Sequence, residues 1–184
     1  DFISVRERGS FDNVKSLIGR DPEMNVDPTM LLSKEEWIKI IDEKPILNKD
    51  YILFYDLKNR KEDIQLVKKI SKELKLPVVI TRYMGMDIHF SNFEKHYDCG
   101  PIEFLNLLCH AKLVLSSSFH GNVFSIIFNK PFFALNSKND FRINTLLNQF
   151  DLENRCIAIS NWKDKMSNSY QIDFQQANEE LQKE

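Results

Sequence analysis

One short segment of the sequence holds most of the residues that can do chemistry. Residues 116–122 read SSSFHGN and follow an apolar run that is typical of a buried strand. Where a strand passes into a helix, hydroxyls and backbone N–H groups can bind an anion, because the helix dipole places partial positive charge there. His120 can donate to a phosphate or carboxylate, or transfer a proton near neutral pH. Gly121 lets a ligand or another backbone segment approach closely.

A guanidinium near the start of the chain complements this segment. Arg6 follows the first apolar run, and a guanidinium is the planar, two-pronged donor that suits a carboxylate or phosphate. Arg6 and residues 116–122 together describe a site for a small, doubly anionic ligand. Simpler interpretations stay open. A serine-rich turn commonly only caps a helix, His120 can be a structural residue that closes the turn, and Arg6 can be a surface ion-pair partner.

The elements that must position these residues follow an alternating pattern. Short β-rich runs alternate with longer amphipathic stretches, which is typical of βα units around a mainly parallel sheet, so we expect an α/β fold. The predicted strands are residues 2–5, 24–26, 51–55, 77–81, 113–115 and 131–135. The predicted helices are residues 11–18, 34–41, 61–74, 122–128 and 142–150, with another beginning at Pro101. Ser33 and Glu36 predict a capping box for the second of these helices.

The polar residues that end these strands are expected to share one edge of the sheet. In an open α/β sheet, ligands bind beyond the carboxyl ends of the strands. The polar strand ends are Arg6, Asp27, Asp56, Arg82, residues 116–120 and Asn136. Residues 84–100 form a polar and aromatic loop between the predicted elements, and a final helix is expected to place Tyr170, Phe174, Ala177 and Leu181 on one apolar face.

Composition excludes several classes of function. The 25 basic and 27 acidic residues give a net charge of −2, which argues against nucleic acid as a partner. No apolar run approaches the ~18 residues needed to cross a bilayer. Cys99, Cys109 and Cys156 are irregularly spaced, which favours a reducing compartment. His89 and His96 lack the spacing of metal ligands, so no metal site is expected. These features predict a cytoplasmic protein with no transmembrane segment, with the inner membrane face as a possible peripheral location.

Three blocks of the sequence resemble the polysaccharide pyruvyl transferase family. They are residues 3–7 (ISVRE), residues 26–32 (VDPTMLL), and the long run from residue 101 through residues 117–132 (SSFHGNVFSIIFNKPF). The tail agrees as well, with FRI at residues 141–143 and LENR at residues 152–155. The third block is fairly specific in both content and spacing.

The resemblance implies a glycosyltransferase-B-like enzyme of two Rossmann-like halves, of which this chain looks like the carboxyl-terminal half. It implies transfer of the enolpyruvyl group of phosphoenolpyruvate, without metal or cofactor, to a sugar hydroxyl of a surface polysaccharide or its lipid-linked precursor, giving a pyruvate ketal. The family's donor site uses an Arg at the position of Arg6 and an Arg-x-His motif whose His falls on His120. Ser118 stands at the first position of that motif here, so helix N–H groups, Ser117, Ser118 or Arg142 would bind the phosphate. The predicted substrate-binding residues also include Phe119, Gly121 and Asn136.

Two alternative functions stay in view. A nucleotide-sugar glycosyltransferase of the same broad fold would want an acidic residue for a ribose, and residues 136–140 offer only Asp140. A non-catalytic binding domain would explain Ser118 in place of an Arg.

We expect residues 1–165 to form a Rossmann-like three-layer donor-binding domain and residues 166–184 a terminal helix that packs on it or on a missing amino-terminal half. A homodimer through the cleft face is a further possibility.

Overall fold

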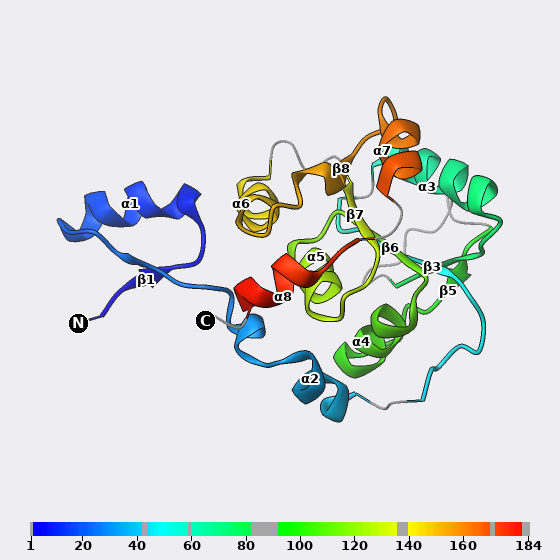
Figure 1. The fold of residues 1–184 in the computed structure, drawn as a ribbon, viewed down its shortest axis with the longest axis horizontal. Coiled ribbons are helices and arrows are strands. Elements are labelled where there is room, and N and C mark those ends of the chain that lie inside the picture. Colours follow the sequence, from blue (N-terminus) through cyan, green and yellow to red (C-terminus); the bar gives the residue numbers. More distant parts are fainter. Residues whose placement is uncertain are drawn as a thin grey trace.

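The computed structural model describes residues 2–41, 44–58, 60–81, 92–135, 140–169 and 172–181. These residues form two parallel β-sheets flanked by helices (Figure 1). The larger sheet has six strands in the order β5-β4-β3-β6-β7-β8, and every neighbouring pair is parallel. The predicted α/β class with a mainly parallel sheet is therefore confirmed.

The centre of the larger sheet consists of β3 (Ile52–Tyr55), β6 (Leu113–Ser116) and β7 (Phe132–Leu135), which are almost wholly buried. Strands covered on both faces have continuous apolar sequences, which is why the pattern locates them well. The outer strands are β4 (Val78–Ile80), β5 (Glu94–Lys95) and β8 (Cys156–Ile157). β5 lies inside the predicted loop and β8 has no predicted counterpart, because strands of two residues have no periodicity to detect.

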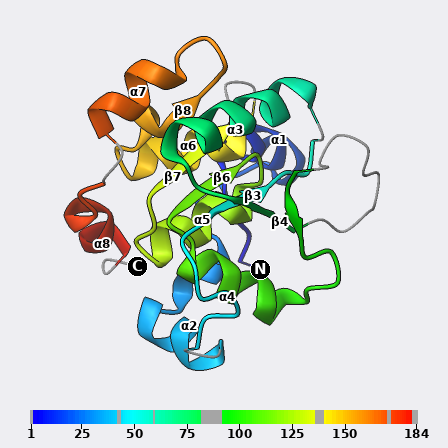
Figure 2. The same cartoon turned by 90° about the vertical axis from the view of Figure 1, so that its right-hand side faces the viewer.

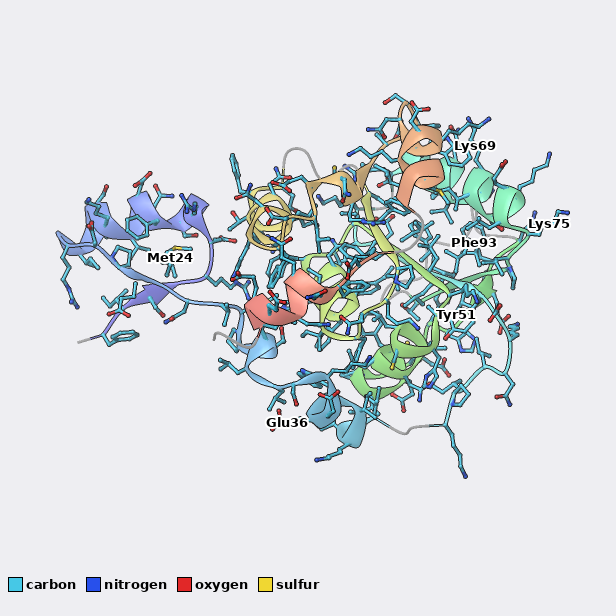
Figure 3. All side chains as sticks on the ribbon, in the orientation of Figure 1. Met24, Glu36, Tyr51, Lys69, Lys75 and Phe93 are labelled. Carbon is cyan, nitrogen blue, oxygen red and sulfur yellow. The ribbon has the colours of Figure 1, made fainter. Side chains whose placement is uncertain are left out.

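Helices cover both faces of this sheet. Leu53, Val114 and Phe132 point into a core shared with α4 (Pro101–His110), α5 (Phe119–Ile127) and α6 (Phe141–Gln149). The alternate strand residues, Phe54 and Leu115 among them, pack against α3 (Lys61–Leu74) and α7 (Trp162–Ser169). Figure 2 shows α3 and α4 on opposite sides of β3 and β4. Figure 3 shows Tyr51 and Phe93 inside this body, while Lys69 and Lys75 project from α3 and its end into solvent.

The smaller sheet is a separate unit at the amino-terminal end. β1 (Ser4–Val5) pairs in parallel with β2 (Glu23–Met24), and α1 (Arg8–Ile18) connects them. We call these residues, 4–24, the N-terminal unit; it lies to one side of the larger sheet (Figure 1). The expectation that Arg6 ends a strand of the same sheet as residues 116–120 is therefore wrong. Arg6 reaches the larger sheet from outside it.

The segment between β2 and β3 joins the N-terminal unit to the larger sheet. It contains the 3₁₀ turn η1 (Pro28–Leu31) and α2 (Lys34–Ile40). The predicted capping box of α2 is confirmed: the Ser33 hydroxyl accepts from the Glu36 N–H at 3.2 Å, and the Glu36 carboxylate accepts from the Ser33 N–H at 2.8 Å. The turn η1 has its own cap, because the Asp27 carboxylate accepts from the Thr29 N–H at 3.1 Å.

The last described helix, α8 (Gln175–Leu181), begins later than the predicted terminal helix. Ala177 is buried, and half-buried Phe174 and Leu181 pack on the core shared with α5, so the prediction that this face covers apolar surface is confirmed. Tyr170 lies outside the described residues. No helix among the described residues has the length and apolar character that a membrane span requires.

Candidate functional site

The site begins where β6 passes into α5. The helix starts at Phe119, three residues before the predicted start at Asn122, and Ser118 is its N-cap residue. His120 therefore lies in the first helical turn, and 48% of its side chain is exposed. The prediction missed this boundary because it assigned the whole polar run to the turn. In the structure the turn ends at Ser118, which is the N-cap residue of the helix. First-turn N–H groups have no partner within a helix, so they are available to an anion.

Two of the three serines are used by the fold itself. The Ser116 hydroxyl donates to the Tyr55 carbonyl at 2.9 Å and accepts from the Ser118 N–H at 3.0 Å. The Ser117 hydroxyl donates to the Asp56 carboxylate and accepts from the Leu57 N–H at 3.2 Å. These bonds tie the carboxyl ends of β6 and β3 together. Ser117, predicted as a substrate ligand, is thus engaged in the fold, whereas Ser118 forms no side-chain cap bond.

Gly121 has a packing role that decides between its two predicted uses. A Cβ on this residue would lie 2.3 Å from the Ser116 Oγ and 3.1 Å from the Tyr55 Cδ1. Such distances lie well inside van der Waals contact, so glycine is what allows α5 to approach β3 and β6. The structure therefore places Gly121 against the sheet rather than against open space for a ligand.

The carboxylate of Asp27 brings Arg6 and His120 together. Asp27 follows β2, and only 3% of its side chain is exposed. Its Oδ2 accepts from the Arg6 guanidinium and lies 3.6 Å from the His120 Nε2. Its Oδ1 accepts from the N–H of Thr29 at 3.1 Å and from the Thr29 hydroxyl at 2.8 Å. The predicted cation and imidazole thus meet at one buried anion, although Arg6 follows a strand of the smaller sheet and His120 lies on α5.

Two guanidinium groups lie close to the ring of Phe119. The Cζ of Arg6 lies 5.3 Å from the ring centroid, and the Cζ of Arg142 lies 6.0 Å from it. Both distances fall within the range of cation–π attraction. Arg6 comes from the N-terminal unit and Arg142 from the start of α6, so the ring is where cations from two separate elements converge. Phe119, predicted as a substrate contact, provides the platform.

A second carboxylate balances Arg142. Asp140 accepts from the Nε and from the Nη2 of Arg142, at 3.4 Å in each case, and from the Lys58 Nζ at 3.2 Å. Burial would raise the pKa of Asp140, but the hydrogen bonds and charges of Lys58 and Arg142 hold it below its usual value. Asp140 is therefore already engaged as an ion-pair partner, which weakens the case for it as a ribose ligand.

Asp27 is likewise held in its ionised form. Burial would raise its pKa, but the hydrogen bonds from Thr29 and the positive charges of His120 and Arg6 together lower it. A guanidinium carries several N–H donors, and one carboxylate cannot use them all. Arg6 and Arg142 therefore keep donors for a ligand, and the first turn of α5 adds its free N–H groups.

A cavity of about 600 Å³ opens beside Arg6, between the N-terminal unit and α6. Its lining is rich in arginine and amide side chains: Arg6, Arg8, Asn25, Asn144, Asn148 and Gln149. Arg6 also lines the small gap next to Phe119 and Arg142. The cation cluster is therefore continuous with a larger cavity.

Sequence reasoning anticipated several of these residues but not the role of Asp27. Arg6, His120, Phe119 and Arg142 converge in the structure. Asn136, and the strand-end residue Arg82, lie outside the described residues. Asp27 appears among the polar strand ends, but nothing in its sequence context shows that it faces both Arg6 and His120. Only the packing of η1 against α5 and of α1 against α6 reveals that contact.

Comparison with known proteins gives a family and a fold. The family model for polysaccharide pyruvyl transferase matches residues 1–139, a span that includes Arg6, Asp27 and His120. The search of curated proteins found no match.

Solved structures place the fold among glycosyltransferase-B-like proteins. The Methanocaldococcus jannaschii UDP-GlcNAc 2-epimerase, in complex with UDP-GlcNAc and UDP, is 15% identical with a TM-score of 0.62, over 100% of this chain and 55% of that one. The E. coli heptosyltransferase WaaC with ADP is 10% identical with a TM-score of 0.47, over 90% of this chain and 57% of that one. At 15% identity the likeness to the epimerase shows the fold alone. The chain spans little more than half the length of either protein.

Proposed function

Because the chain belongs to the polysaccharide pyruvyl transferase family, we propose that it supplies the donor site of an enzyme that transfers the enolpyruvyl group of phosphoenolpyruvate to a sugar hydroxyl. The acceptor would be a polysaccharide or its precursor, and the product a pyruvate ketal. One observation carries the proposal: Arg6, His120 and Arg142 gather around Phe119 at the amino-terminal end of α5.

This cluster suits a donor with two anionic groups. Phosphoenolpyruvate carries a carboxylate and a phosphate, and charge-assisted hydrogen bonds to guanidinium groups are the strong ones. Arg6 and Arg142 lie on the same ring, so each can bind one anionic group while the N–H groups of α5 take the remaining charge. Two separate arginines thus match the two charged ends of the donor.

Arg142 can also replace the Arg that the family motif has where this chain has Ser118. The family's Arg-x-His motif would place a guanidinium two residues before His120, and this chain has Ser118 there. The guanidinium of Arg142 lies 6.0 Å from the ring of Phe119, the residue between Ser118 and His120. A cation from α6 therefore stands close to where the missing one is expected. This supports a working anion site over a domain that has lost its chemistry.

The chemistry requires a proton donor next to the bound anion. A proton is added to the methylene carbon of phosphoenolpyruvate, and the adjacent carbon, which becomes oxocarbenium-like, is attacked by a sugar hydroxyl that loses its own proton. Phosphate then leaves with the electrons of its C–O bond, and a second sugar hydroxyl attacks the same carbon and loses its proton, which closes the ketal. His120 is the acid we assign to the first step, because its ring is half-exposed at the anion site and an imidazole can donate a proton.

Calorimetric titration with phosphoenolpyruvate tests the donor site. We expect the chain to bind it, and we expect Arg6→Ala and Arg142→Ala to weaken binding by about tenfold to a hundredfold each, the range for a lost hydrogen bond to a charged group. Lys69→Ala is the matched control, since it removes one exposed positive charge from α3 on the other side of the sheet. Equal affinity for all variants would remove these arginines from the donor site. A melting temperature raised by uridine diphosphate but not by phosphoenolpyruvate would favour a nucleotide-sugar enzyme instead.

A further inference from the structure

The two oxygens of the Asp27 carboxylate do different work. Oδ1 accepts both hydrogen bonds from Thr29, at 3.1 Å from the N–H and 2.8 Å from the hydroxyl, and so caps η1. Oδ2 faces the guanidinium of Arg6 and the Nε2 of His120. The cap fixes the orientation of the carboxylate, and that orientation aims Oδ2 at the two predicted site residues.

Arg6 needs such an anchor. Its side chain is long and 40% exposed, and Arg6 follows β1, which is not part of the larger sheet that α5 packs on. The contacts that the structure gives this side chain across to α5 are the ring of Phe119 and, through Asp27, the neighbourhood of His120. A cation–π contact is weak at a partly exposed site. The buried carboxylate is therefore the stronger restraint on where the guanidinium points.

We propose that Asp27 is a positioning residue of the donor site, which holds Arg6 over Phe119 and faces His120 so that both present their remaining N–H groups to the bound anion. The inference rests on the proposed function of this cluster as a donor site. Asp27 does not touch the donor in this scheme; it acts through Arg6 and His120.

A positioning role and a simple charge effect predict opposite results. If Asp27 acted only as a negative charge near the site, its removal would tighten the binding of an anion, because one repulsion is lost. If Asp27 positions Arg6, its removal frees that side chain and weakens binding. Asp27→Asn separates the two cases, since the amide oxygen can still accept from Thr29 while the amide N–H₂ replaces the oxygen that accepts from Arg6.

The test is calorimetric titration of the full chain with phosphoenolpyruvate. We expect Asp27→Asn to raise the dissociation constant at least tenfold, and Asp27→Glu to raise it too, because the longer side chain keeps the charge but moves it. Asp21→Asn is the matched control: it removes the same charge from an exposed ion pair with Lys15 and leaves the dissociation constant unchanged. In an Arg6→Ala background, Asp27→Asn should cause a smaller further loss than in the wild type, because only its contact with His120 remains. Tighter binding by Asp27→Asn, or an equal loss with and without Arg6, would overturn the proposal.

A measurement on the ligand-free protein separates this inference from the proposed function. In protein with isotope-labelled arginine, a guanidinium held by a buried carboxylate has a shifted, slowly exchanging side-chain N–H signal. We expect Arg6 to give such a signal in the wild type and in Asp21→Asn, and to lose it in Asp27→Asn and Asp27→Glu. A wild type that does not bind phosphoenolpyruvate would refute the proposed function, whereas an Arg6 signal that is unchanged in both Asp27 variants would refute the positioning role.

Discussion

Replacing Gly121 with alanine should destabilise the protein and disturb the start of α5. The added Cβ would lie 2.3 Å from the Ser116 Oγ and 3.0 Å from the Ser116 Cβ. The hydroxyl cannot rotate away freely, because it is bonded to the Tyr55 carbonyl and the Ser118 N–H. Overpacking costs about 1–3 kcal/mol, and each lost hydrogen bond costs about 1 kcal/mol more. Alanine regains up to about 1 kcal/mol of helix propensity, so we expect a net loss of about 2 kcal/mol.

Urea unfolding of Gly121→Ala measures this loss, and the chain supplies a matched control. A Cβ on Gly9, in the first turn of α1, would be no closer than 3.5 Å to its nearest neighbour, Phe141, so Gly9→Ala should keep or raise the free energy of unfolding. The double variant Gly121→Ala with Ser116→Ala should be less destabilised than the two single effects combined, since the closest clash is removed. A free energy of unfolding for Gly121→Ala equal to that of the wild type would refute the packing argument.

Three further predictions concern ionisable and hydrogen-bonded groups elsewhere in the fold and at the site. The pKa values of Asp27 and Asp140 are lowered in the folded protein, so the stability they contribute is present above the pKa of the unfolded chain and is lost as the pH falls through the lower folded value. The wild type should therefore lose stability below about pH 4 more steeply than Asp27→Asn or Asp140→Asn, which acid-unfolding curves will check. Ser117→Ala should lower the free energy of unfolding by about 1–3 kcal/mol in urea, because it leaves the buried Asp56 carboxylate without one donor. Burial raises the pKa of Tyr51, so the absorbance of this residue should not change at pH values where exposed tyrosines ionise. Its hydroxyl donates to the Leu107 carbonyl, so Tyr51→Phe should lower the free energy of unfolding by about 1 kcal/mol.

The sequence predicts the larger sheet and its helices well because buried segments have recognisable patterns of apolar residues. The central strands are covered on both faces, so their residues form uninterrupted apolar runs, and α3 shows an apolar stripe from Ile64 to Ile70. Local rules also hold where they depend on neighbours in the chain, as in the cap of α2 by Ser33 and Glu36. What the sequence cannot supply is the partition of strands between sheets. β1 and β2 look like members of the main sheet until their pairing is seen.

At the candidate site, too, the sequence does not show which residues far apart in the chain are in contact. His120 was predictable from its position at the start of a helix that follows a central strand, because parallel βα topology gathers such ends. The same argument does not account for Arg6, because Arg6 follows a strand of the smaller sheet. The roles of Ser117 and Gly121 were not predictable, since both depend on contacts with β3, some sixty residues away in the chain. Asp27 is the clearest case. Its partners Arg6 and His120 lie on either side of it in the sequence, and a carboxylate at a strand end gives no sign of which cations it will meet.

The separation of the two sheets has a chemical consequence for the site. Arg6 is carried by the N-terminal unit and Arg142 by α6, yet both lie on the ring of Phe119. The spacing of the two guanidinium groups is therefore set by how the N-terminal unit sits against the larger sheet, and the structure fixes that placement through α1 against α6 and through Asp27. A donor whose carboxylate and phosphate each bind one arginine would bridge the same two bodies. Binding of the donor and docking of the N-terminal unit should therefore stabilise each other, because both depend on the same pair of cations.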